Sequence, residues 1–132
     1  MKAHFPSADE YSAEKARYPG LSVVDVRAHL AAIHESYRND VLSNVNDNCL
    51  RLAVFDGEYR WHQHPDSDEL FLVVEGKLLV DLAGHDTLEL DPWQCAVVPA
   101  GTVHRTRTSG RTVNLAFEKQ QAKTVFLDAR DH

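Results

Sequence analysis

The residues with the clearest capacity for chemistry lie in the stretch WHQHPDSDE, at positions 61–69. His62 and His64 belong to a segment typical of a β-strand, YRWHQHP, and side chains two positions apart on a strand point to the same face. Two imidazoles about 6.5–7 Å apart at the backbone can converge on one metal ion. Glu69 begins the next strand-like run after a loop of four residues, which is long enough to bring its carboxylate alongside them.

A third histidine follows much later, in the stretch PAGTVHR. Pro99 and Gly101 predict a turn, and His104 comes after it at the start of another strand. His104 would complete a set of three imidazole nitrogens and one carboxylate oxygen. Imidazole ligands suit Fe, Mn, Ni, Zn or Cu, whereas an all-oxygen set suits Mg or Ca. Such a set leaves open positions on an octahedral ion, where water, dioxygen or a bidentate substrate can bind.

The neighbours of these four residues predict the walls of a substrate-binding pocket. Strand alternation places Arg60 on the face of the first two histidines, where it would bind a carboxylate or phosphate group; the alternative is an ion pair at the end of the barrel. Phe71 and Val73 share the face of the glutamate, and Thr106 shares that of the third histidine. The alternative for the four residues is a group of polar side chains at the open end of the barrel that binds no ion. A glutamate buried beside three imidazoles is costly without a cation, which favours the metal site.

The elements that must position these side chains are mainly strands. From about residue 40 onward, short runs rich in Val, Leu, Phe, Tyr and Thr alternate with turn signals, which predicts an antiparallel sandwich or barrel. Asp56-Gly57 suits a tight type I′ hairpin, and the stretch 75–77 suits another tight turn. Tyr59 and Trp61 are expected on the outer face of their strand.

Ahead of the strands, residues 23–35 predict one amphipathic helix. Val26 and Leu30 lie at helical spacing, and Ser22 is the candidate N-cap. Residues 1–20 are polar, contain prolines and show no sustained period, so they are expected to be irregular. They are either disordered or form a strap that packs on a neighbouring subunit.

The first histidine stretch resembles the first motif of the cupin superfamily, a group of small double-stranded β-helix barrels. That motif reads G(X)5HXH(X)3–4E(X)6G, and this chain matches it from Gly57 through His62, His64 and Glu69 to Gly76. The first spacing is one residue short.

The second histidine stretch resembles the second cupin motif, G(X)5PXG(X)2H(X)3N. Pro99, Gly101 and His104 stand in the right relation, while Trp93 and Thr108 occupy the positions of the first glycine and the asparagine. A turn at the preceding Asp-Pro pair is expected to replace the glycine. No metal ligand is lost through these departures.

The resemblance implies an all-β fold, a double-stranded β-helix with a short N-terminal helix. Residues 1–38 would form an N-terminal extension and helix, residues 39–118 the cupin barrel and residues 119–132 a C-terminal tail. It also implies one divalent transition metal ion (Fe, Mn, Ni or Zn) on the four residues above. Family members commonly pair as homodimers, which would cover an open edge strand.

Composition excludes several other classes of function. The chain has 132 residues, which fits one domain, and a formal net charge of −6, which disfavours nucleic-acid binding. It contains no apolar run of membrane-spanning length, and its first residues lack the apolar stretch of a secretory signal. We therefore expect a cytoplasmic protein that binds neither nucleic acid nor membrane.

The function expected from these patterns is that of a metal-binding single-domain cupin. It would act on or bind a small polar molecule, such as a carboxylate, a hydroxy-ketone or a sugar-like compound. Dioxygenase and isomerase chemistry both suit the site, and the alternative is non-catalytic binding or sensing of a small molecule. Isomerisation requires a base near the metal. Glu69 is the only carboxylate that the sequence places there, which favours dioxygenation or simple binding.

Overall fold

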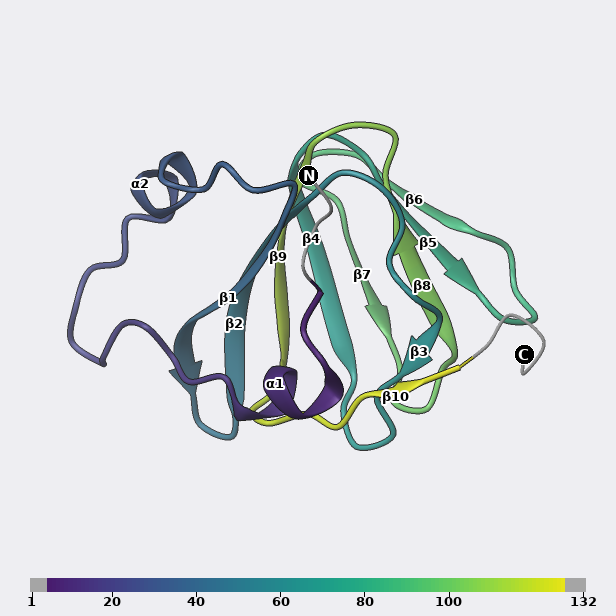
Figure 1. Cartoon of the computed structure of the whole chain (residues 1–132), viewed down its shortest axis with the longest axis horizontal. Helices are drawn as coiled ribbons and strands as arrows, with labels where there is room; N and C mark the ends of the chain where they lie inside the picture. Colours follow the sequence, from purple (N-terminus) through teal and green to yellow (C-terminus); the bar gives the residue numbers. More distant parts are fainter. Residues whose placement is uncertain (1–4, 128–132) are drawn as a thin grey trace.

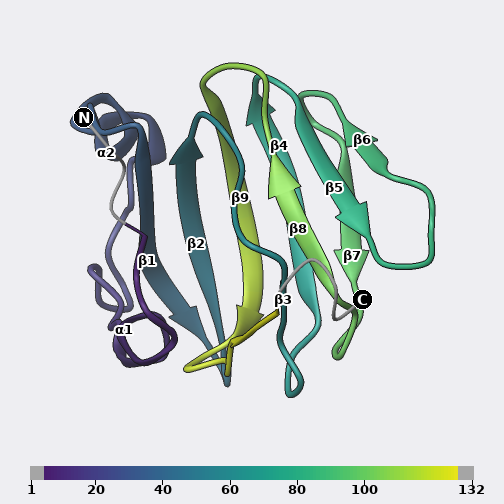
Figure 2. The ribbon, with the colours of Figure 1, turned by 45° about the vertical axis from the view of Figure 1, so that its right-hand side comes forward.

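Two antiparallel sheets face each other and form the body of the molecule (Figure 1). The computed structural model describes residues 5–127. The first sheet has the strand order β1-β2-β9-β4-β7, with β1 (Tyr37–Val45), β2 (Asn48–Phe55), β9 (Thr112–Lys119), β4 (Glu69–Glu75) and β7 (Cys95–Val98). The second has the order β10-β3-β8-β5-β6, with β10 (Val125–Phe126), β3 (His62–Gln63), β8 (His104–Arg107), β5 (Leu78–Leu82) and β6 (Leu88–Leu90). The chain passes repeatedly between the sheets, which confirms the predicted double-stranded β-helix (Figure 2).

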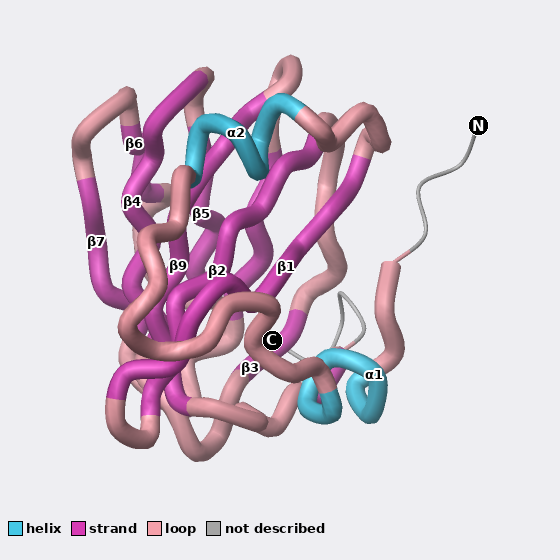
Figure 3. The backbone as a smooth tube through the Cα atoms, turned by 90° about the vertical axis from the view of Figure 1, so that its left-hand side faces the viewer, coloured by secondary structure: helices cyan, strands magenta, loops and turns pink. Residues whose placement is uncertain are grey.

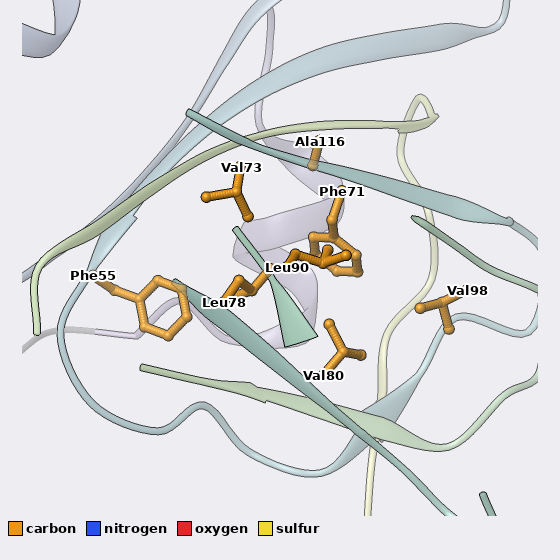
Figure 4. Packing of buried hydrophobic residues seen from close by; sticks show 8 residues of the cluster. All are labelled: Phe55, Phe71, Val73, Leu78, Val80, Leu90, Val98 and Ala116. Carbon is orange, nitrogen blue, oxygen red and sulfur yellow. The ribbon is translucent and has the colours of Figure 1, made fainter. Parts of the chain in front are cut away.

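Apolar side chains fill the space between the two sheets (Figure 4). Every second residue of a strand faces this space, so β4 contributes Phe71 and Val73 while β5 contributes Leu78 and Val80. The complete cluster consists of Phe55, Phe71, Val73, Leu78, Val80, Leu90, Val98 and Ala116. Burial of each large member stabilises the fold by about 1.5–3 kcal/mol, so this cluster holds the two sheets together.

The outer face of the first sheet is covered by the segment around α2 (Val26–Ala31) (Figure 3). Leu42, Leu52 and Val54 point to this face and are buried beneath Ile33, which follows the helix. The N-terminal segment therefore completes a second apolar cluster outside the barrel.

The helix α2 is shorter than the helix predicted over residues 23–35. Its N-cap is Asp25, whose side chain accepts a hydrogen bond from the Ala28 amide at 3.0 Å. Ser22 is not the cap, because its hydroxyl donates to the Pro19 carbonyl instead. The carboxylate cap thus starts the helix later than the apolar spacing suggests. Neither helix of the described residues has the length or the apolar surface to cross a bilayer.

A further helix, α1 (Ala8–Ala13), lies where the sequence predicted irregular structure, and that prediction was wrong for this part. Ser7 and Glu10 form a capping box, in which each side chain accepts a hydrogen bond from the other's backbone amide. After α1 the chain runs along β1, and the amides of Arg17 and Tyr18 donate to β1 carbonyls at 3.0 Å. The described part of the N-terminal segment therefore packs on its own chain, with α1 at the lower end of the barrel (Figure 1).

Both tight turns predicted around glycine are crossings between the sheets. After β2 the chain leaves the first sheet, and Glu58 bridges to Arg107 of the second, so Asp56-Gly57 is not the predicted hairpin. Gly76 connects β4 to β5 with φ +81°. A Cβ atom there would lie 2.8 Å from the Arg111 carbonyl oxygen, so this turn requires glycine for both its conformation and its space.

Trp93 has the left-handed backbone that the second cupin motif assigns to glycine. Its φ is +69°, its side chain is 73% exposed, and its amide donates to the Val73 carbonyl at 2.7 Å. The expectation that the preceding Asp-Pro pair replaces the glycine is corrected, because the left-handed position is kept and a tryptophan occupies it. A left-handed non-glycine residue costs about 1–2 kcal/mol, which the hydrogen bond and neighbouring strands offset.

Candidate metal centre

The four residues singled out from the sequence meet between the two sheets. His62 of β3 pairs directly with His104 of β8 in the second sheet, and His64 follows one residue after β3. Glu69 is the first residue of β4 in the first sheet. One ligand atom from each of the four residues, an imidazole nitrogen or a carboxylate oxygen, lies within 4.8 Å of the others, and all four side chains are buried. The fold thus brings together residues 42 positions apart in the sequence, from 62 to 104.

Each histidine is held in place through its Nδ1 atom. These atoms lie 2.7–2.9 Å from backbone carbonyl oxygens, that of Arg60 for His62, Lys123 for His64 and Thr102 for His104. A carbonyl oxygen only accepts hydrogen bonds, so each Nδ1 carries a proton. Nε2 is then the position for a metal ion or a second proton, and such carbonyl contacts typically orient imidazoles that bind metals.

The atoms at the centre of the cluster lack hydrogen bonds of their own. Glu69 Oε1 lies 3.4 Å from Nε2 of both His64 and His104, longer than a usual N–H···O hydrogen bond. Within residues 5–127, Glu69 Oε1 and His104 Nε2 have no hydrogen-bond partner. Since buried polar atoms are normally satisfied, a cation bound to all four residues would account for this arrangement. Three imidazoles and one carboxylate fit a divalent transition metal.

The members of the cluster differ in the pKa shifts that their surroundings cause. Burial, followed by repulsion from the other two imidazoles, lowers the pKa of His62 to about 3, so this ring is neutral at physiological pH. Burial also lowers the pKa of His64, but the contact with the Glu69 carboxylate outweighs it and raises that pKa to about 9. Burial raises the pKa of Glu69, yet its contacts with His104 and His64 outweigh burial and hold that pKa well below its usual range. Glu69 is therefore ionised, as a metal ligand must be.

A cavity of about 50 Å³ adjoins the cluster. Its aromatic walls are Tyr37, Phe55, Tyr59 and Phe71, and its polar walls include Asn39, Thr106, Asn114 and Thr124. One water molecule needs about 10–15 Å³ of such space, so the cavity admits a ligand of only a few heavy atoms.

Comparison with known proteins agrees with this geometry. The model of the family described as "Cupin domain" matches residues 52–117, which is half of the chain. This chain belongs to the cupin family. The match covers β3 to β8 completely, parts of β2 and β9, and all four clustered residues.

The relatives of this cupin point to the same fold. It is 53% identical over 96 residues to "Uncharacterized protein YdbB" of Bacillus subtilis (strain 168), an alignment that covers 73% of this chain and 85% of the relative. Protein NMB1881 from Neisseria meningitidis superposes with a TM-score of 0.68 at 30% identity, covering 74% of this chain and 99% of that one. A cupin-2 domain containing protein from Shewanella frigidimarina superposes with a TM-score of 0.69 at 25% identity, covering 74% and 94%.

Arg60 does not line the cavity of this cupin, which corrects the expectation from strand alternation. Its side chain is exposed, and its guanidinium lies 3.9 Å from the centre of the Phe126 ring. Tyr59, expected on the outer face, lines the cavity instead, with its ring 5.1 Å from that of His62. The strand β3 begins only at His62, and the irregular backbone before it shifts the alternation.

Of the other predicted wall residues, Phe71 and Thr106 line the cavity. Val73 is fully buried but belongs to the apolar cluster between the sheets, two residues further along β4. Alternation therefore identified the correct face of β4, but not how far the cavity extends along it.

A second buried group of polar residues lies beside the cluster and was not predicted. We call Tyr11, Arg51 and Glu118 the floor network. Glu118 on β9 pairs in register with Glu69 on β4, and its Oε2 lies 4.0 Å from His64 Nε2. Its Oε1 accepts a hydrogen bond from the Tyr11 hydroxyl and forms an ion pair with Arg51 Nε at 2.8 Å.

The floor network is packed tightly against the cluster. The Tyr11 ring stacks on His64 with a centroid distance of 5.7 Å, and the Arg51 guanidinium lies 3.8 Å from the centre of the Tyr11 ring. Burial, followed by repulsion from Glu69, raises the pKa of Glu118 to about 7, although Arg51 opposes this. A second carboxyl group therefore stands next to the candidate metal site.

One sequence signal for Glu118 was present. The run TVNLAFEK alternates, and its polar or small residues Thr112, Asn114, Ala116 and Glu118 share one face, which proves to be the inner one. Tyr11 carried no comparable signal, because its partner Glu118 lies 107 positions away.

Proposed function

We propose that His62, His64, Glu69 and His104 bind one divalent transition metal ion, and that this cupin uses it to bind a small polar molecule. The observation that carries the proposal is the set of converging buried atoms: three imidazole nitrogens, whose rings are oriented through Nδ1, and one carboxylate oxygen that has no hydrogen bond within the described residues. The ion would be Fe, Mn, Ni or Zn, the metals that suit this set of ligands. A bound ion of this kind supplies Lewis acidity to a carboxylate, hydroxy-ketone or sugar-like ligand at its open positions.

The residues of the cavity would select and shield that ligand. Tyr59 and Phe71 exclude water from one side of the cluster, and Thr106 and Asn114 offer hydrogen bonds to polar groups. The small cavity volume of about 50 Å³ favours a compact ligand. Binding of the ligand to the ion is the first step of both dioxygenase and isomerase reactions. A non-catalytic sensor would require this binding alone. Isomerisation requires a base near the metal, and the carboxylate of Glu118, which lies near the site, is a second candidate for it besides Glu69.

Thermal unfolding with and without metal tests the proposal. The metal-loaded protein should be stabilised by at least one compound from a panel of small carboxylates, hydroxy-ketones and diols, because ligand binding to the folded state raises its stability. The metal-free protein and a His62→Ala, His64→Ala variant should show no such shift. Equal shifts in all three samples would contradict the proposal. Recovery of the stabilising compound unchanged after incubation under air would favour sensing, and its conversion would establish an enzyme.

We also propose that the chain forms a homodimer in the cytoplasm. The edge strand β7 is the candidate for pairing between subunits, since edge strands are usually covered and residues 14–18 already cover part of the other edge, β1. Sedimentation analysis should give twice the mass of the chain, and a monomer at all concentrations would contradict the proposal.

A further inference from the structure

Asn114 is a buried carboxamide in the wall of the cavity. The residue is 2% exposed and lies on the inner face of β9. Among residues 5–127 its side chain has no hydrogen-bond partner, whereas Asn39, which also lines the cavity, accepts a hydrogen bond from Arg51 at 3.0 Å. A carboxamide carries two N–H donors and an acceptor oxygen, and leaving such groups unpaired in the interior is costly. Packing within the described chain therefore gives no reason for a carboxamide at this position.

Asn114 lies at the end of the cavity that is remote from the metal cluster. Its neighbours on the inner face are small: Ala53 is its partner on β2, and Ala116 lies two positions along β9. Both alanines line the cavity as well. On the other side Asn114 pairs with Val73, four residues beyond Glu69 on β4, which separates the two ends by about 14 Å of backbone at about 3.4 Å per residue. The cavity thus has a metal-binding end and a carboxamide end, with two small residues between them.

The two ends of the cavity differ in charge. With a divalent ion bound, one net positive charge would remain at the cluster, because Glu69 neutralises only one of the two and imidazoles bind metals in their neutral form. That end favours an anionic group of the ligand. No Lys or Arg of residues 5–127 lines the cavity, so a second anionic group beside Asn114 would be buried without a cation. The charges therefore favour a carboxylate at the ion and a neutral polar group at the carboxamide.

We propose that the cavity binds a small monocarboxylate whose carboxylate lies on the metal ion and whose other end carries a neutral polar group that hydrogen-bonds to the Asn114 carboxamide. This inference rests on the proposed metal site. A carboxamide both donates and accepts hydrogen bonds, so it pairs with a hydroxyl, a carbonyl or an amide of the ligand but not with a methyl group. A methyl group there leaves the buried carboxamide unpaired, and sites of this kind discriminate strongly against ligands that lack the polar group.

4-Hydroxybutyrate and pentanoate are suitable probes, because they are monocarboxylates of equal length that differ only in a terminal hydroxyl against a methyl group. Binding of each to the Co(II)-loaded protein is followed through the visible absorption of the ion. The substitution Asn114→Leu keeps the size of the side chain and removes its polar atoms. It should lower the ratio of the affinity for 4-hydroxybutyrate to that for pentanoate by about tenfold, the value of one hydrogen bond. Asn44→Leu makes the same change at an exposed position outside the cavity and should leave the ratio unchanged.

Urea unfolding of the metal-free protein separates ligand recognition from a structural role. An apolar side chain in place of an unpaired buried carboxamide should leave the midpoint of Asn114→Leu unchanged or raise it. A lower midpoint would show that the carboxamide stabilises the fold, and it would overturn the inference. An affinity ratio that is equal in the wild type and Asn114→Leu, or no binding of 4-hydroxybutyrate to the Co(II)-loaded wild type, would also overturn it. Failure of the wild type to bind Co(II) would instead overturn the proposed metal site, so the two failures are distinguishable.

Discussion

Two buried groups of polar side chains meet at His64, and they are built in opposite ways. The candidate metal cluster is supported from outside, through backbone carbonyls on each Nδ1, and two of its central atoms, Glu69 Oε1 and His104 Nε2, lack a hydrogen bond within residues 5–127. The floor network is held by its own opposite charges, with Arg51 between Glu14 and Glu118, although Arg51 Nε and Glu118 Oε2 make no hydrogen bond within the described residues. The cluster would therefore be completed by the proposed metal ion, whereas the floor network already contains the opposite charges that hold it together. Changes in the first should therefore affect binding most, and changes in the second should affect folding stability most.

The largest expected effect comes from Arg51→Ala. The substitution leaves Glu118 buried without its cation, and breaking a buried ion pair in this way costs about 3–5 kcal/mol. Denaturant unfolding of the metal-free protein measures the loss. Arg105→Ala is the matched control, because Arg105 pairs with Asp81 nearer the surface and Arg107 remains bound to that carboxylate, so we expect a loss of about 1 kcal/mol or less. Similar losses for the two variants would contradict the contrast between the floor network and an ordinary ion pair.

Tyr11→Phe should have the next largest effect. It removes the hydroxyl that donates to Glu118 and keeps the ring that stacks on His64, so the stability should fall by about 1.5–3 kcal/mol, the range for a hydrogen bond to a charged group. Metal content should not change. Tyr18→Phe, which removes a hydroxyl bonded to His29 at 2.7 Å, is the matched control with a smaller expected loss. Loss of metal from Tyr11→Phe would show that the two groups are not separable in function.

The metal affinity should depend on pH through His64. Without metal its pKa is about 9, above the ordinary value, so this ring is protonated at neutral pH and a metal ion must displace that proton. The affinity should rise about tenfold per pH unit from about 6.5 to 9 and then level off, since below the pKa each unit raises the deprotonated fraction of His64 about tenfold. Calorimetry in buffers of different ionisation enthalpy should show release of about one proton per ion at neutral pH. An affinity independent of pH in this range would contradict the protonated state of His64.

The smallest effect should come from Trp93→Gly. The residue is exposed and has φ +69°, so glycine removes the left-handed strain but gains freedom in the unfolded chain, and the net gain should be about 0.5–1 kcal/mol. Gly84→Ala is the opposite change at φ +76° with open space around it, and it should destabilise by a similar amount. Thermal unfolding measures both. A loss of stability in Trp93→Gly would show that the indole contributes more than its exposure suggests.

The sequence predicted the cluster of four residues because they lie in short local motifs. His62, His64 and Glu69 fall within eight positions, and strand alternation is sufficient to place the two histidines on one face. The same rule failed at Arg60 and Tyr59, because the backbone there is irregular and alternation holds only within a regular strand.

The floor network could not be predicted in the same way. Tyr11, Arg51 and Glu118 come from a capped helix, β2 and β9, and only the register of the first sheet brings Glu118 beside Glu69. Local patterns carry no information about such pairing across strands. An antiparallel sandwich or barrel was predictable, since many short alternating runs with regular turn signals are typical of all-β folds, and the resemblance to the two cupin motifs specified the double-stranded β-helix.

Elemental analysis of the purified protein tests the central claim most directly. The samples are the wild-type chain, the His62→Ala, His64→Ala variant and a His34→Ala, His85→Ala control, whose two histidines are exposed and lie outside the cluster. We predict about one Fe, Mn, Ni or Zn ion per chain in the wild type and the control, and none in the cluster variant. Absence of metal from the wild type even after incubation with each ion, or equal metal in all three samples, would contradict the account.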